Sequence, residues 1–272
     1  RGDLRDWEIV NRPAKGFVPS YEDGALGPFF ALWAKEPGKA PVTRCLERAI
    51  GEEDYEGASG CREANHGMPR FCKASFSAAY PLGQLTLRDP AVPVQVRLEA
   101  FNPLIPGDAD ASGLPIAVLR YVLINKTDRP VKAAVCGSLP NFIGADGVTD
   151  VAKDNVIRFR KTKDFRGLFF SSEGVCECAE TFGTMALTTT ATDVTYWTNW
   201  PKGPTQWRAY YQAFWDDFGD DGRLCANRPG TTRPQGSLAA SVTVPARGEK
   251  AVTFILGWHF PNRTTWTPLN DK

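Results

Sequence analysis

The stretch Pro115–Leu139, PIAVLRYVLINKTDRPVKAAVCGSL, decides the fold class. Residues 116–124 place apolar side chains on both faces of an extended chain, interrupted only by Arg120, so this strand is covered on both sides for most of its length. Residues 125–130 then supply the Asn, Asp and Pro of a turn, and apolar alternation resumes at Val131. The pattern predicts a β-hairpin at the centre of a sandwich, around which the other strands pair.

Alternating side chains predict most of the remaining elements as strands. These lie at 29–33, 71–80, 83–87, 92–101, 156–161, 167–171, 184–190 and 195–200. A second hairpin is predicted from the alternation of 237–244 and 252–258 around a turn at 246–250. Residues 34–70 lack sustained periodicity and are predicted to be a long connection with one helical turn near 44–50. The fold class is therefore all-β, a large two-sheet antiparallel β-sandwich.

One segment, near 207–218, has the period of a short amphipathic helix. Its aromatic residues stand at i, i+3, i+4, i+7 and i+11: Trp207, Tyr210, Tyr211, Phe214 and Phe218. Such a stripe indicates core packing, with the helix laid on the sandwich. The alternative is a platform on which sugar rings stack.

Composition and charge exclude several classes of function. A formal net charge of +1 over 272 residues creates no overall field for nucleic acid. The basic residues within 158–166 are diluted by Asp154 and Asp164, so a solvated loop is the better interpretation. No apolar run approaches the roughly 20 residues of a membrane span. We therefore predict neither a nucleic-acid partner nor a membrane span.

The seven cysteines do not form an obvious framework: Cys45, Cys61, Cys72, Cys136, Cys176, Cys178 and Cys225. An odd count, with one cysteine inside an apolar strand, favours reduced thiols and hence a cytoplasmic location over disulfides. Cys61, His66 and Cys72, or Cys176 and Cys178, could be drawn as metal ligands. Neither set has the paired spacing of a zinc site, so structural thiols are favoured and no metal is predicted.

Catalytic motifs are absent from the sequence. There is no G-x-S-x-G elbow, phosphate loop or dinucleotide fingerprint, so no cofactor is predicted. Of the two histidines, His259 lies between Trp258 and Phe260, where a packed, hydrogen-bonded ring is expected. A glycosidase needs two carboxyl groups flanking one bond. The formal candidates are Asp216, Asp217, Asp220, Asp221 and Glu99, which are expected to be merely solvated, so no catalytic residue is assigned.

Several segments, taken in order, resemble the N-terminal domain of glycoside hydrolase family 116. The family contains β-glucosidases and β-xylosidases, among them the non-lysosomal glucosylceramidase, also called bile acid β-glucosidase. The matching segments are GDLRDWEI (2–9) with NRP (11–13), LEAF (98–101) with Pro103 and IP (105–106), SGLP (112–115), Asn125 with DRP (128–130), WDDF (215–218) with DG (221–222), and GWHFPNR (257–263). Their order and nearly end-to-end span make the resemblance specific.

The resemblance implies a sandwich of the supersandwich type packed against a C-terminal (α/α)6 barrel. In the family, that barrel carries a Glu nucleophile and an Asp acid/base and retains anomeric configuration. We therefore expect residues 1–262 to be an N-terminal sandwich truncated at its start, and 263–272 to be a linker towards a missing barrel. The chain alone is expected to be inactive, with that barrel as its partner and a β-glucoside as the substrate of the barrel.

Three functions remain open from the sequence. In the first, the domain supports the barrel and contacts it through the loop Asn102–Gly113 and the helix at 207–218. In the second, the chain is an autonomous carbohydrate-binding module that uses its aromatic side chains. In the third, the chain is a small enzyme that is complete within 272 residues. The absence of a convergent acid/base pair disfavours this third function. The natural glycoside and the oligomeric state are not encoded in any motif.

Overall fold

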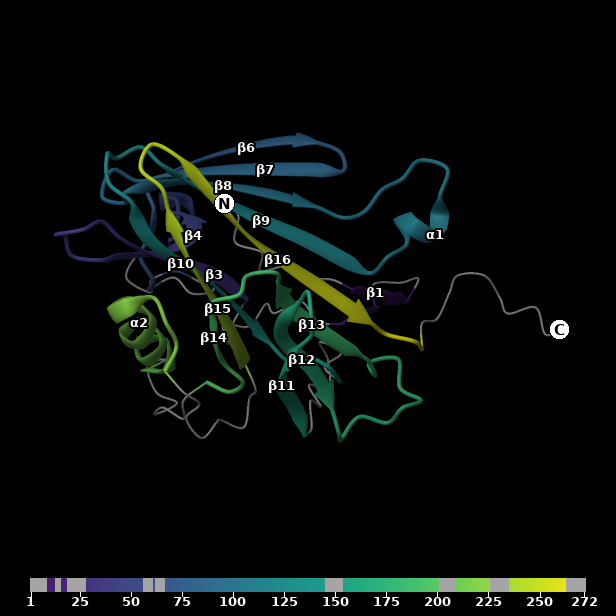
Figure 1. Cartoon of the computed structure of the whole chain (residues 1–272). Coiled ribbons are helices and arrows are strands. Elements are labelled where there is room, and N and C mark those ends of the chain that lie inside the picture. Colours follow the sequence, from purple (N-terminus) through teal and green to yellow (C-terminus); the bar gives the residue numbers. More distant parts are fainter. Residues whose placement is uncertain are drawn as a thin grey trace.

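Two large β-sheets packed face to face make up most of the described part of the chain, with the helix α2 on an outer face (Figure 1). The computed structural model describes residues 9–12, 16–18, 28–55, 61, 67–144, 154–200, 209–225 and 235–262. The six-stranded sheet has the order β14 (Val194–Trp197), β15 (Gln235–Val244), β10 (Val131–Pro140), β3 (Phe29–Lys35), β4 (Val42–Arg48) and β5 (Arg70–Phe71). The eight-stranded sheet has the order β11 (Asn155–Lys161), β12 (Arg166–Ser172), β13 (Thr184–Thr189), β16 (Glu249–His259), β9 (Ile116–Asn125), β8 (Val94–Phe101), β7 (Leu82–Arg88) and β6 (Lys73–Ala79).

The other described elements are small. β1 (Ile9–Arg12) pairs with β2 (Gly16–Val18), and the helices are η1 (Glu52–Asp54), α1 (Ala109–Ser112) and α2 (Ala209–Asp221). Paired strands are antiparallel except β4 and β5, which run parallel. The predicted all-β sandwich with two antiparallel sheets is therefore confirmed. Within the described residues, no helix is long and apolar enough to span a membrane.

The main core lies between the two sheets and follows from the period of two in each strand. Phe30 and Leu32 of β3 point inward, whereas Phe29 on the same strand points outward. The ring of Phe30 meets the rings of Tyr121 and Phe254 from the opposite sheet at centroid distances of 5.1 and 5.2 Å. The two sheets thus turn apolar faces to each other, and removing these faces from water stabilises the sandwich.

Both connections predicted as hairpins cross between the sheets instead. β9 pairs with β8 and β16, whereas β10 pairs with β3 and β15, so the two predicted arms of residues 115–139 do not pair with each other. In the same way β15 belongs to the six-stranded sheet and β16 to the eight-stranded sheet. A hairpin and a crossing connection have the same alternation. Here the apolar faces of the two strands meet across the core, which places the strands in opposite layers.

Asn125 holds the first crossing in place from a fully buried position. Its Nδ2 donates to the backbone carbonyls of Arg129 at 2.8 Å, Pro245 at 3.0 Å and Val244 at 3.4 Å. Its Oδ1 accepts from both the backbone N–H and the hydroxyl of Thr127, at 2.9 and 2.8 Å. One amide side chain therefore satisfies the backbone of both corners, which a carboxylate could not do.

The two crossings lie side by side and are tied together. The Asn125 N–H donates to the Gly248 carbonyl at 2.9 Å, and the Arg247 N–H donates to the Thr127 carbonyl at 3.0 Å. The Arg247 guanidinium also donates to Asp128 at 2.7 Å, on the solvent side. At this edge, the sheets are thus joined by two cross-linked corners.

Helix α2 covers the outer face of the six-stranded sheet, as the aromatic stripe predicts. Tyr211, Phe214 and Phe218 are buried against strand residues of that sheet. Phe214 stacks on Trp200 with ring centroids 5.0 Å apart and meets Phe29 edge-on at 5.2 Å. Core packing is therefore confirmed for these three rings. Trp207 and the side chain of Tyr210 lie outside the described residues.

The prediction of a connection with one helical turn across 34–70 is wrong, because β4 is a strand of the six-stranded sheet. Because β4 contains charged residues, the sequence pattern did not identify it as a strand. In the fold two of them find partners: Arg44 lies 3.2 Å from Asp89, and Glu47 lies 2.9 Å from Arg70. The second pair is almost fully buried, with side chains 5% exposed on both partners. Pairing makes these charges compatible with a covered strand.

Candidate functional site

The carboxylates singled out in the sequence lie on opposite faces of the sandwich. Asp216, Asp217, Asp220 and Asp221 belong to α2, outside the six-stranded sheet. Glu99 belongs to β8 and faces outward from the eight-stranded sheet, since its neighbour Leu98 points into the core. Two sheets packed about 10 Å apart separate Glu99 from the aspartates. Glu99 therefore cannot form with them a pair that flanks a glycosidic bond.

Glu99 is neutralised by its own neighbours. Its carboxylate accepts hydrogen bonds from Arg97 at 2.8 Å and from Arg120 on β9 at 2.5 Å. Partial burial raises the pKa of Glu99, but the hydrogen bonds from the two arginines outweigh it and leave the pKa below its ordinary value. A general acid requires the opposite shift, so Glu99 acts as the centre of a surface ion-pair network.

The expected packed ring of His259 is wrong. His259 is exposed at the end of β16, and its neighbour Trp258 is the residue that packs against the core. The alternation of β16 turns Leu256 and Trp258 inward, which leaves position 259 facing solvent. His66 lies outside the described residues.

The expectation of reduced thiols is wrong for one pair of cysteines. Cys176 and Cys178 form a disulfide across two residues, with Cα atoms 5.3 Å apart. Cys61 is buried and Cys72 is exposed. Within the described residues, no cluster of three or more His, Cys, Asp or Glu side chains is arranged to hold a metal ion.

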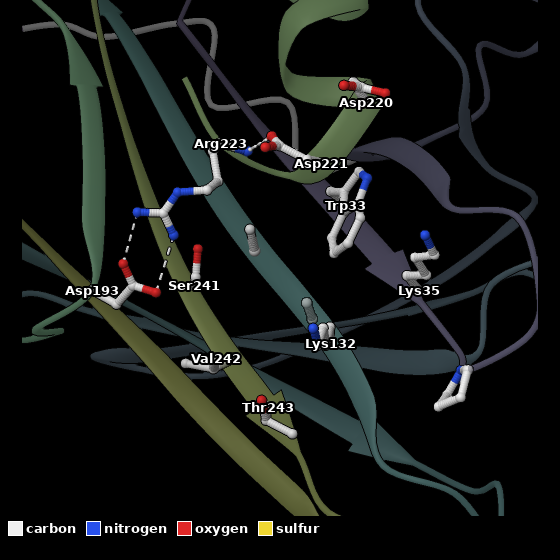
Figure 2. Close-up of a pocket in the computed structure, with 13 residues that line it drawn as sticks. Trp33, Lys35, Lys132, Asp193, Asp220, Asp221, Arg223, Ser241, Val242 and Thr243 are labelled. Carbon is white, nitrogen blue, oxygen red and sulfur yellow. Dashed lines mark hydrogen bonds and ion pairs between the residues drawn. The ribbon is translucent and has the colours of Figure 1, made fainter. Parts of the chain in front are cut away.

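A groove of about 680 Å³ lies on the outer face of the six-stranded sheet, beside the C-terminal end of α2 (Figure 2). Its floor consists of two rows that run across β3, β10 and β15. The rows are Trp33–Ala134–Ser241 and Lys35–Lys132–Thr243. The strands bring together residues more than 200 positions apart, because β10 pairs with β3 on one side and with β15 on the other.

The rim of the groove carries a two-point ion pair. The Arg223 guanidinium donates to both carboxylate oxygens of Asp193, at 2.9 and 3.1 Å (Figure 2). Hydrogen bonding to Asp193 raises the pKa of Arg223 further above its ordinary value. The Asp221 carboxylate accepts from the Arg223 backbone N–H at 2.9 Å. These contacts fix the segment after α2 as one wall of the groove.

Trp33 is held rigidly at the inner end of the groove. Its indole Nε1 donates to the Gly219 carbonyl at 3.1 Å, and only 6% of the residue is exposed. Gly222 covers the indole: a Cβ there would lie 2.7 Å from Trp33 Cε3, and its φ of +77° also favours glycine. Trp33 therefore offers the groove an edge and no open stacking face.

Sequence reasoning missed the groove. Asp220 and Asp221 were candidates there, but only as catalytic acids. The only signal in the strands was the run of polar residues on their outward faces, and outward polar residues are ordinary in a sandwich. Their convergence depends on strand order, which the sequence does not reveal.

A second feature is an exposed apolar surface at the end of β8. We call it the loop surface; it comprises Leu82, Phe101, Leu104, Ile105 and Leu114, which are between 37% and 57% exposed. Leu82 and Phe101 face each other in one cross-strand row, and the other three belong to the loop that follows β8. That loop, which carries α1, projects beyond the sheet (Figure 1). Five large apolar side chains exposed at this strand end and on the loop after it suit an interaction site.

The loop is ordered by its own hydrogen bonds. The Ile105 N–H donates to the Ser112 hydroxyl at 2.8 Å, and that hydroxyl donates back to the Ile105 carbonyl at 3.0 Å. Asp108 caps α1 by accepting from the Ala111 N–H at 2.9 Å. Asn102 ties the base of the loop to the Ile116 carbonyl at 2.8 Å. The loop thus presents its apolar side chains in a defined arrangement.

The fold and its surfaces define a large β-sandwich domain. The chain matches a polysaccharide lyase with a TM-score of 0.46 and 10% identity, over 96% of this chain and 30% of that one. It matches a heparan sulfate lyase mutant from Pedobacter heparinus with a TM-score of 0.36 and 10% identity, over 74% of this chain and 23% of that one. The chain thus spans less than a third of these structures. Residues 1–268 match the family described as "beta-glucosidase 2, glycosyl-hydrolase family 116 N-term", and the chain belongs to that family.

Proposed function

We propose that this chain is the non-catalytic N-terminal domain of a retaining β-glycosidase of the β-glucosidase and glucosylceramidase type. In this proposal, residues 1–262 form the domain, 263–272 lead towards an (α/α)6 barrel, and the barrel hydrolyses the β-glucoside. The domain supports the barrel by packing against it. An N-terminal domain of a glycoside hydrolase implies a catalytic partner domain. The observation that carries the proposal is the loop surface, because its exposed apolar side chains suit a surface that this partner covers.

The position of the last strand supports this choice of partner. Gly257 of β16 pairs with Ile116, and the Trp258 N–H donates to the Pro115 carbonyl at 3.0 Å. The end of β16 therefore lies beside the base of the loop that carries Leu104 and Ile105. A domain connected after β16 starts next to the loop surface, so its effective concentration there is high.

We propose no second contact with the barrel through the aromatic face of α2. The rings of Tyr211, Phe214 and Phe218 are buried against the six-stranded sheet and are not available to a partner. The same burial removes support for an autonomous module that stacks sugars on this helix. The loop Asn102–Gly113 is therefore the part of the original contact hypothesis that we retain.

Charging the loop surface tests the proposal. In the intact enzyme, the double variant Leu104→Asp and Ile105→Asp should lower the unfolding temperature of the catalytic domain by at least about 3 °C and raise KM for an aryl β-glucoside. The reason is that two desolvated carboxylates would oppose docking. Calorimetry and steady-state kinetics measure both effects. The same substitutions in the isolated chain should leave its unfolding temperature unchanged, since both side chains are already exposed.

Tyr55→Asp with Phe165→Asp is the matched control. These side chains are 53% and 41% exposed, the first after η1 and the second between β11 and β12, and neither belongs to the loop surface or neighbours it in the chain. The control pair should change neither the unfolding temperature nor KM of the intact enzyme. If the loop variant behaves like this control, the loop surface is not a docking site and the proposed supporting role loses its basis.

A further inference from the structure

We propose that the groove beside the C-terminal end of α2 binds a sugar acid, meaning a polyhydroxylated ligand that carries a carboxylate. A volume of about 680 Å³ suits a mono- or disaccharide, since small-ligand sites span roughly 300–1,000 Å³. The groove and the loop surface lie on different sheets, so this inference is independent of the proposed docking.

The first reason is an uncompensated pair of lysines. Lys35 and Lys132 stand directly opposite each other on β3 and β10, on the outward face of the sheet. Like charges in this relation destabilise a sheet, because the two Cβ atoms lie only about 5 Å apart. Within the described part of the chain, neither ammonium group has a hydrogen-bond or ion-pair partner, although Asp220 and Asp221 line the same groove. A ligand carboxylate would relieve the repulsion.

The second reason is a set of unused hydrogen-bonding groups around the lysines. Ser241 and Thr243 present hydroxyls that can both donate and accept. The Asp220 carboxylate lines the groove and can accept from ligand hydroxyls. Among the described residues, none of these three side chains has a hydrogen-bond partner. Hydroxyls and a carboxylate acceptor next to cations suit a polyol with an acidic group better than a bare anion.

The third reason is that the groove is polarised along its length. Asp220 and Asp221 sit at the end of α2, where the helix dipole adds negative potential. Lys35 and Lys132 occupy the other part of the floor (Figure 2). Asp193 cannot neutralise them, because Arg223 holds both of its oxygens. The ligand carboxylate is therefore directed to the lysines and the ligand hydroxyls to the aspartates.

Calorimetric titration of the protein at low salt tests the assignment. A disaccharide ending in glucuronic acid should bind with a Kd of about 1 mM or tighter, and cellobiose, its neutral counterpart, at least tenfold more weakly. The Lys35→Gln and Lys132→Gln double variant should bind the acidic disaccharide at least tenfold more weakly. Its unfolding temperature should stay the same or rise, because the like-charge contact is removed. Raising the salt concentration should also weaken binding.

The matched control is Lys73→Gln with Lys250→Gln, two exposed lysines of the other sheet, which should leave binding unchanged. Asp220→Asn should lower the affinity for the acidic disaccharide without creating affinity for cellobiose. Three results would overturn the proposal: no binding of the acidic disaccharide, equal binding of cellobiose, or equal binding of inorganic phosphate. Loss of docking by the loop variant would leave all these titrations unaffected, so the two proposals fail separately.

Discussion

Replacing Phe214 with Ala is expected to lower the free energy of unfolding by about 4 kcal/mol, the range for deleting a buried aromatic ring. Phe214 is fully buried at the centre of the outer core. It stacks on Trp200 and on Phe218, at 5.0 and 5.6 Å, and meets Phe29 edge-on. Side chains of the six-stranded sheet, of α2 and of connecting segments, among them Met68 and Leu224, form this core, so deleting the ring leaves a cavity among them.

Urea unfolding monitored by tryptophan fluorescence measures this effect, because Trp197 and Trp200 border the cavity. The control is Gln212→Ala, an exposed position on the same helix, which should change stability by less than about 0.5 kcal/mol. A loss below about 1 kcal/mol for Phe214→Ala would mean that α2 contributes little to the stability of the sandwich. A reduced denaturant slope would instead indicate that α2 detaches before the sheets separate.

Changing Asn125 to Asp is expected to lower the free energy of unfolding by about 3 kcal/mol or more at pH 7. The amide Nδ2 donates to three backbone carbonyls, and a carboxylate of the same shape would face them with no donor at all. Because the site is buried and lined by carbonyl oxygens, the pKa of the introduced carboxyl would be raised above its unfolded value of about 3.9.

The sign of the pH dependence follows from that shift. A raised pKa means that the folded state binds its proton more tightly than the unfolded state. The variant should therefore be least impaired below pH 4 and should lose stability relative to the native protein as the pH rises through the pKa of the folded state. Urea titrations of both proteins between pH 3 and pH 7 measure the difference.

Asn102→Asp provides the comparison, since Asn102 also donates to one backbone carbonyl but is exposed. Its cost should stay below about 1 kcal/mol and vary little with pH. If the Asn125 variant lost as little stability as this control, the two corners would not depend on the buried amide. The crossing between the sheets would then need another explanation.

The sequence was most informative where a pattern is local. The strands predicted at 92–101 and 184–190 are confirmed as β8 and β13, and the 3.6-residue period identified the buried face of α2. Short segments such as SGLP at 112–115 and GWHFPNR at 257–263 identified the family, which the match over residues 1–268 confirms. The sequence also singled out the loop at 102–113, which the structure shows to be an ordered, exposed projection.

The failure to predict β4 has a tertiary cause. The strand β4 was missed because Arg44 and Glu47 read as surface residues until Asp89 and Arg70 reach them from elsewhere in the chain. The β4 pairs depend on contacts between residues distant in sequence, for which a local window carries no information. The exposure of His259 is different, because the alternation that turns Leu256 and Trp258 inward already places position 259 on the outer face.

By itself, the sequence determined the all-β class, most of the strands, the buried face of α2 and the family to which the chain belongs. Only the tertiary structure decided that β9 and β10, and likewise β15 and β16, stand in opposite sheets, and that two lysines and two hydroxyls converge in one groove. The reason is that alternation specifies the two faces of a strand but not its neighbours. Neighbours are selected by the fit of whole faces across the core, which is a property of the assembled sandwich.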